Sequence, residues 1–120
     1  MKKFLITLGL LSLLLGIVII RTDCFLEISS RVHNRVGYFY LQRWKWDKAI
    51  IEFKKALENH NYSHQEFAYY NLGEVYYKKK AYGMSLQAYK KALECREDFK
   101  EVADRVIFLE EILLSKGENS

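Results

Sequence analysis

Hydrophobic residues fill most of the first twenty positions of the chain and then give way to a mixed pattern. After two lysines, an uncharged run extends from Phe4 to Ile20. A helix over these 17 residues covers about 26 Å, close to the ~30 Å hydrocarbon core of a bilayer. The pattern therefore predicts a transmembrane anchor over residues 1–22, with residues 4–20 in contact with lipid, and a linker at 23–29.

A cleaved signal peptide is the competing interpretation of this segment. Such a peptide usually has an apolar region of ~7–15 residues that ends at a small-x-small cleavage site. The nearby Thr22-Asp23-Cys24 is a poor site, so an uncleaved anchor is favoured. The lysines before the run favour a cytoplasmic amino terminus, although arginines beyond it reduce the asymmetry. We expect a single-pass membrane protein whose soluble domain lies on the exported side.

The soluble part repeats itself at a fixed offset. The segment from Lys54 to Glu58 recurs 36 positions later, from Lys90 to Glu94. In the second unit, one helix face is predicted by the spacing i, i+3, i+4, i+7, and a second helix by small, aromatic and small residues at i, i+4, i+7. A glycine in the middle of the first helix indicates a close approach of two helices. The positions are Tyr69, Leu72, Gly73 and Tyr76, followed by Ser85, Tyr89 and Ala92.

This pattern resembles the tetratricopeptide repeat. The first unit matches it through Val36, Gly37, Tyr40, Trp46, Ala49, Phe53 and Ala56. The chain departs from the family because it lacks the proline that usually closes a repeat, and because its units lie 36 residues apart where about 34 are usual.

The resemblance implies an all-α fold, in which a single transmembrane helix precedes a short α-solenoid of two helical hairpins. A further amphipathic pattern, with Val102, Val106, Leu109 and Leu113 on one stripe, predicts a helix that caps the solenoid, followed by a tail with a stop at Gly117. The expected segments are repeat 1 at 30–65, repeat 2 at 66–99, the capping helix at 100–115 and the tail at 116–120.

The resemblance also implies a binding site, because the first helix of each repeat lines a concave groove that holds peptides or partner helices. Packing of the aromatic residues inside the superhelix is the alternative. The set of residues that grips a carboxylate in some members is matched only by Asn71 and Arg105, and Glu101 would repel such a ligand. By register, the expected groove residues are Arg31, Asn34, Tyr38, Leu41, Gln42, Phe67, Tyr70, Glu74, Tyr77 and Lys78.

Charge and composition narrow the classes of function. The net charge of +4 falls to +2 without the two N-terminal lysines, so no footprint for nucleic acid is present. His60 and His64 lie across a predicted turn, which breaks the geometry of a metal site, and no catalytic set of side chains is found. We therefore expect no enzyme, no cofactor and no metal. For Cys24 at the membrane boundary, a free thiol, an acylated thiol and a disulfide stay open.

Together these patterns predict a membrane-anchored adaptor that mediates protein–protein interaction in the assembly or organisation of a membrane complex. The alternative is a small accessory subunit held mainly by its transmembrane helix. Two repeats are few for a stable solenoid, so a protein partner, other subunits of the complex or a homodimer would complete the domain.

Overall fold

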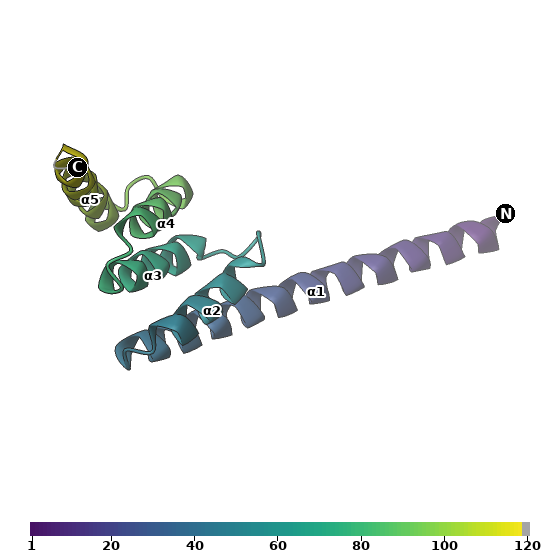
Figure 1. The fold of residues 1–120 in the computed structure, drawn as a ribbon. Coiled ribbons are helices and arrows are strands. Elements are labelled where there is room, and N and C mark those ends of the chain that lie inside the picture. Colours follow the sequence, from purple (N-terminus) through teal and green to yellow (C-terminus); the bar gives the residue numbers. More distant parts are fainter. Residues whose placement is uncertain (119–120) are drawn as a thin grey trace.

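The structure, a computed structural model, describes residues 1–118, which form helices and no strands (Figure 1). This confirms the all-α fold. The helices are α1 (Lys2–Gln42), α2 (Trp46–Leu57), α3 (Gln65–Lys78), α4 (Tyr82–Cys95) and α5 (Lys100–Glu118).

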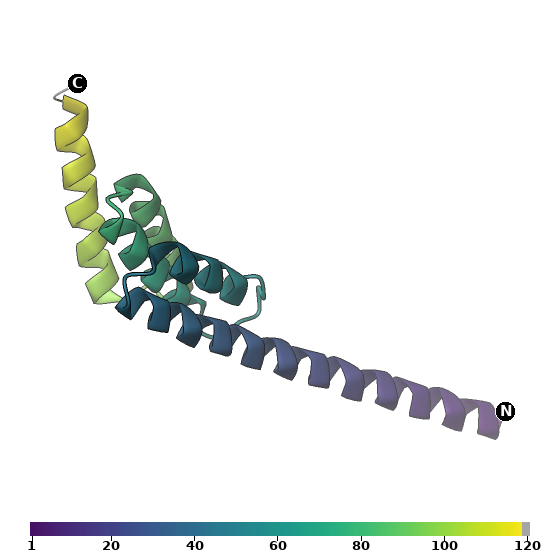
Figure 2. The same ribbon diagram turned by 60° about the horizontal axis from the view of Figure 1, so that its bottom comes forward.

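α1 is a single unbroken helix of 41 residues. Its N-terminal half projects away from the other helices (Figures 1 and 2), which extends the molecule to 78 Å in its longest dimension. The apolar stretch is long enough to cross a membrane, and none of it is buried. Residues 23–29, expected as a linker, are helical and continue α1. The sequence between Gly16 and Gly37 contains no glycine or proline that would interrupt the helix.

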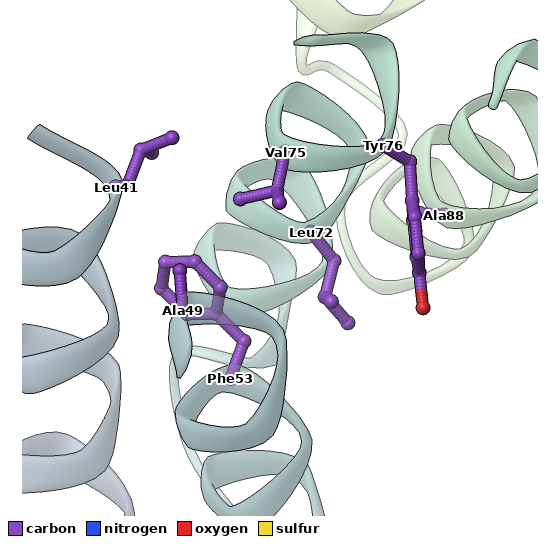
Figure 3. Packing of buried hydrophobic residues seen from close by; sticks show 7 residues of the cluster. All are labelled: Leu41, Ala49, Phe53, Leu72, Val75, Tyr76 and Ala88. Atoms are coloured by element: carbon purple, nitrogen blue, oxygen red, sulfur yellow. The ribbon is translucent and has the colours of Figure 1, made fainter. Parts of the chain in front are cut away.

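Two helical hairpins follow one another along the chain. The C-terminal part of α1 pairs with α2, α3 pairs with α4, and α5 packs on α4. The small–aromatic–small pattern is confirmed as the centre of each hairpin, because Ala49, Phe53 and Ala56 have no exposed surface, nor have their counterparts Ser85, Tyr89 and Ala92. The core between the hairpins joins α1 to α4 and consists of Leu41, Ala49, Phe53, Leu72, Val75, Tyr76 and Ala88 (Figure 3).

The predicted close approach of helices at Gly73 is confirmed. A Cβ atom at this position would lie 2.5 Å from the ring of Tyr89. The first hairpin repeats the arrangement, with 2.7 Å between a Cβ atom at Gly37 and the ring of Phe53.

α5 closes the open side of the second hairpin. Val102, Val106 and Leu109 are buried there, in one cluster with Phe99 and Tyr89. The C-terminal end of α5 is bare, since Leu114 is 68% exposed. The helix runs through the expected stop at Gly117 to Glu118, and the last two residues of the predicted tail, 119 and 120, lie outside the described part of the chain.

Candidate protein-binding groove

A hollow of about 370 Å³ lies between the end of α1, the α1–α2 turn and α3. α3 presents a row of side chains to it, because residues four positions apart share one helix face. We call this hollow the groove; its lining is Tyr38, Leu41, Gln42, Trp44, Trp46, Tyr70, Asn71, Glu74 and Lys78. The structure therefore brings together six of the residues expected from the register: Tyr38, Leu41, Gln42, Tyr70, Glu74 and Lys78.

The groove borders a second hollow of about 480 Å³, with which it shares Tyr38, Gln42 and Asn71. Asn34, another expected residue, lines this second hollow. Asn71 Nδ2 donates a hydrogen bond of 3.3 Å to Asn34 Oδ1. The bond joins the first helices of the two hairpins and forms the polar edge between the two hollows.

The two charged residues that line the groove, Glu74 and Lys78, differ in whether they have a partner within residues 1–118. The Tyr89 hydroxyl donates a hydrogen bond to Glu74 Oε1, and Arg105 approaches the same oxygen at 3.5 Å. Burial raises the pKa of Tyr89, and the hydrogen bond to Glu74 raises it further, so the phenol stays neutral. Lys78, in contrast, is exposed and makes no ion pair within residues 1–118. The charge that the groove leaves free is therefore positive.

α5 packs mainly on α4, and side chains of α5 and of the turn before it also contact side chains of α3. The ring of Phe99 packs 5.8 Å from Phe67 and 5.5 Å from Tyr70, measured between centroids. Tyr70 also donates a 2.8 Å hydrogen bond to Glu101, and its pKa is raised, first by burial and then by this bond. Tyr77 lies 6.5 Å from Phe108. Thus Phe67 contacts the turn before α5, Tyr77 contacts α5, and Tyr70 contacts both while it also lines the groove.

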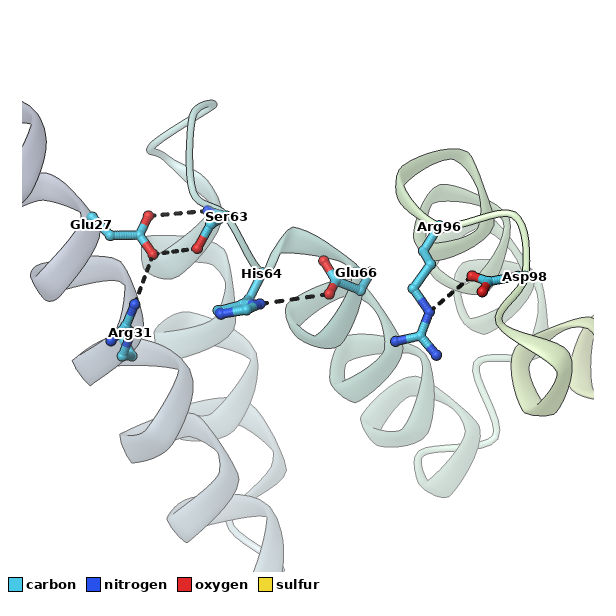
Figure 4. Close-up of polar contacts among 7 residues, drawn as sticks. All are labelled: Glu27, Arg31, Ser63, His64, Glu66, Arg96 and Asp98. Atoms are coloured by element: carbon cyan, nitrogen blue, oxygen red, sulfur yellow. Dashed lines mark hydrogen bonds and ion pairs between the residues drawn. The ribbon is translucent and has the colours of Figure 1, made fainter.

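Arg31 lies outside the groove, on the side of α1 nearer the apolar segment. It makes a 3.3 Å ion pair with Glu27, which also accepts hydrogen bonds from the backbone N–H of Ser63 (3.0 Å) and from its hydroxyl (2.5 Å) (Figure 4). These bonds, chiefly that from the hydroxyl, lower the pKa of Glu27 although burial acts in the opposite direction. They fasten the α2–α3 turn to α1. Glu27, Arg31 and Ser63 line a third hollow, separate from the groove, and the exposed Cys24 borders it as well.

The register missed three lining residues: Trp44, Trp46 and Asn71. Trp44 is 78% exposed and has a φ of 58°. Its counterpart 36 positions later, Lys80, has a φ of 61°, so both hairpins use the same tight turn. The sequence did contain a signal for Trp44, because it has a tryptophan at the turn position where the second repeat has a lysine.

Other chemistry at the site is limited. No three His, Cys, Asp or Glu side chains within residues 1–118 gather in a way that could hold a metal ion. His64 lies in the α2–α3 segment with its Nδ1 3.7 Å from Glu66 (Figure 4). Of the positions that would form a carboxylate clamp, Glu101 accepts from Tyr70 and Arg105 pairs with Glu74. Both charged side chains are therefore engaged within the fold.

Comparison with known families agrees with this geometry. Residues 67–99, which span α3 from Phe67 onward, α4 and the following turn, match the family model of the tetratricopeptide repeat. The match confirms the resemblance of the second unit, and the first hairpin shares its buried pattern and turn. Tetratricopeptide repeats are typically non-catalytic modules of protein–protein interaction. A search of curated proteins found no match to the chain.

Proposed function

We propose that this chain, which carries a tetratricopeptide repeat at residues 67–99, is a membrane-anchored adaptor. Its groove holds a peptide or helix of a partner protein, and its apolar N-terminal segment, residues 4–20, holds the domain at the membrane. A tethered domain meets its partner at a higher effective concentration than a free one. The setting that fits both features is the assembly or organisation of a membrane protein complex.

The groove itself carries this proposal. Aromatic side chains dominate the residues on which binding energy concentrates in interfaces, and the groove offers Tyr38, Trp44 and Tyr70 within one hollow. The Lys78 ammonium lies at the same hollow and makes no ion pair with any residue from 1 to 118, whereas Glu74 is paired. The fitting ligand is therefore an apolar or aromatic segment with a carboxylate that reaches Lys78.

Alanine substitution of Tyr38 in the full chain, purified in mild detergent, tests the groove. Tyr38 is 51% exposed, and Met84 on α4, outside the groove, is 50% exposed, so Met84→Ala is a matched control. We expect Tyr38→Ala to reduce recovery of the co-purifying partner about tenfold, and Met84→Ala to leave it unchanged. Equal recovery from both folded variants would rule out the groove as the binding site.

The proposed topology places the soluble domain on the exported side. It rests on the lysines that precede the apolar run and on the length of that run. Protease added to sealed, right-side-out vesicles is expected to digest residues beyond 21 while the N-terminal segment stays protected. Digestion that occurs only after the vesicles are opened would place the domain in the cytoplasm.

A second function is favoured by the bare N-terminal half of α1, of which no residue in the apolar stretch is buried. In this function the chain is an accessory subunit whose transmembrane helix makes the main contacts. A chain that starts at residue 21 separates the two. The adaptor binds its partner without the anchor, whereas the accessory subunit loses it.

A further inference from the structure

α1 carries an apolar stripe beyond its membrane-spanning stretch that no other helix covers. Phe25, Ile28, Val32 and Phe39 are between 49% and 70% exposed. These four residues and two arginines form a series in which the spacing alternates between four and three residues. This spacing places all six on one helix face. We call this set the α1 stripe; its members are Arg21, Phe25, Ile28, Val32, Arg35 and Phe39.

The hairpin partner of α1 lies on the other side of the helix. Ser30, Gly37 and Leu41 are the buried residues of α1, and they lie about half a turn around the helix from the stripe. Figures 1 and 2 show α2 along one side of α1 only. A row of exposed large apolar side chains in water marks an interaction site.

The two arginines give the stripe a defined chemistry. Neither Arg21 nor Arg35 makes an ion pair within residues 1–118. The acidic residues of this part of α1 do not belong to the stripe, and Glu27 is bound by Arg31 and Ser63. The stripe is thus apolar with two guanidinium groups, unpaired in the described part of the chain, that lie 14 residues apart, or about 21 Å along the helix.

We propose that the α1 stripe binds a second helix, supplied by another protein, whose facing side is apolar and carries carboxylates opposite Arg21 and Arg35. Steps of four and three residues are the pattern by which two long helices pack along each other. The same steps continue from Arg21 back through Val18, Leu14 and Leu11. Given the proposed anchoring, the partner helix therefore emerges from the membrane beside α1.

Charge argues against a second copy of this chain as the occupant. In a parallel pair of identical helices the same position of each chain faces its copy, so Arg35 would meet Arg35 and Arg21 would meet Arg21. Like charges placed together across an interface weaken it. Carboxylates at these two places would instead form charge-assisted hydrogen bonds with the guanidinium groups.

The test measures fluorescence energy transfer between the labelled full chain and a labelled probe helix in phosphatidylcholine vesicles. The chain is labelled at the exposed Cys95 in a Cys24→Ser background. One probe is a synthetic helix as long as α1, with leucine facing the stripe and glutamate opposite both arginines, and a second probe has lysine at the two places. The variant Arg35→Glu is compared with Lys54→Glu, which makes the same change of charge at an exposed position of α2. A third sample mixes donor-labelled and acceptor-labelled copies of the chain.

We expect the glutamate probe to bind the unchanged stripe about tenfold more tightly than the lysine probe. Arg35→Glu is expected to abolish this preference, because Arg21 still favours glutamate while the introduced carboxylate favours lysine, whereas Lys54→Glu keeps the preference. Equal binding of both probes to the unchanged chain, or no binding of either, would overturn the proposal, and so would a preference for glutamate that persists in Arg35→Glu. Transfer between two copies that exceeds transfer to the glutamate probe would overturn it too, because the occupant would then be a second copy. Arg35 and Phe39 also line the second hollow, which borders the groove, but the groove is tested separately, because Tyr38→Ala is judged by recovery of the co-purifying partner and not by binding of the probes.

Discussion

The ring of Tyr89 occupies the place where a side chain of residue 73 would lie. A Cβ atom on Gly73 would be 2.5 Å from two carbons of that ring, and the buried Ser85 hydroxyl donates a 2.8 Å hydrogen bond to the Gly73 carbonyl. No glycine in residues 1–118 has a positive φ. Glycine is therefore required at this position by the neighbouring ring and not by the backbone conformation.

Gly73→Ala is accordingly expected to destabilise the protein. Overpacking of a full core costs about 1–3 kcal/mol, which exceeds the ~1 kcal/mol that alanine gains over glycine as a helix former. Gly83→Ala is the matched control, because a Cβ atom on Gly83 in α4 meets nothing within 4 Å. Chemical denaturation of the full chain in detergent, followed by circular dichroism, measures both. If Gly73→Ala were as stable as Gly83→Ala, the packing argument would fail.

Tyr89→Phe tests the bond to Glu74 without removing the ring. Phe53 occupies the equivalent position of the first hairpin and is equally buried, so a phenylalanine ring fits such a site. We expect a loss of about 1 kcal/mol in the free energy of unfolding, because Glu74 loses a donor and keeps only Arg105. Tyr38→Phe, which removes an exposed hydroxyl, serves as the control. Unchanged stability of Tyr89→Phe would show that the hydroxyl contributes nothing.

Much of the fold could be predicted because the packing rule is local. Small, aromatic and small residues at fixed spacing identify the buried face of each second helix, and the two glycines mark where the rings sit. The continuity of α1 was not predicted. Asp23 and the arginines end the apolar run, which indicates where a membrane ends, but they do not end a helix. A helix is ended by glycine, proline or a capping residue, and none of these interrupts α1 after the apolar run.

The residues of the candidate groove could be predicted only where their position follows from spacing along one helix. Tyr70, Glu74 and Lys78 follow from their spacing on α3, and they do line the groove. The placement of Trp44 depends on how the α1–α2 turn folds over α3, which is a tertiary relationship. In the same way, the contacts of Phe67 with Phe99 and of Tyr77 with Phe108 arise from the docking of α5. Spacing along one helix carries no information about this docking.

A pair of glycine substitutions separates the backbone role of Trp44 from its side chain. Trp44 and Lys80 both have left-handed φ values, of 58° and 61°, where an L-residue is disfavoured by roughly 1–2 kcal/mol. Trp44→Gly and Lys80→Gly are each expected to raise the free energy of unfolding by about 1 kcal/mol. Only Trp44→Gly is expected to weaken partner binding, measured by recovery of the co-purifying partner. Equal recovery from both variants would remove Trp44 from the binding surface.

The bond between Glu27 and Ser63 predicts how stability depends on pH. The pKa of Glu27 lies below its ordinary value of 4.5, chiefly because the Ser63 hydroxyl donates a hydrogen bond to the carboxylate. A group whose pKa is lowered by folding contributes stability above its unfolded pKa and loses it as the pH falls through the folded pKa. The contribution of Glu27 is therefore complete at pH 7 and is lost progressively as the pH falls from about 4.5 through the lower pKa of the folded state.

Glu27→Gln should consequently flatten part of the acid limb of the stability curve. Denaturation at a series of pH values between neutral and about pH 3 is the measurement. We expect a smaller loss of stability on acidification in Glu27→Gln and in Ser63→Ala than in the unchanged chain. Some loss persists, because the pKa of Glu52 is also lowered, chiefly by its hydrogen bond with His33. Glu97→Gln, at an exposed position without an ion pair in residues 1–118, is the control. If it flattened the curve as much as Glu27→Gln, the effect would come from net charge and not from the bond to Ser63.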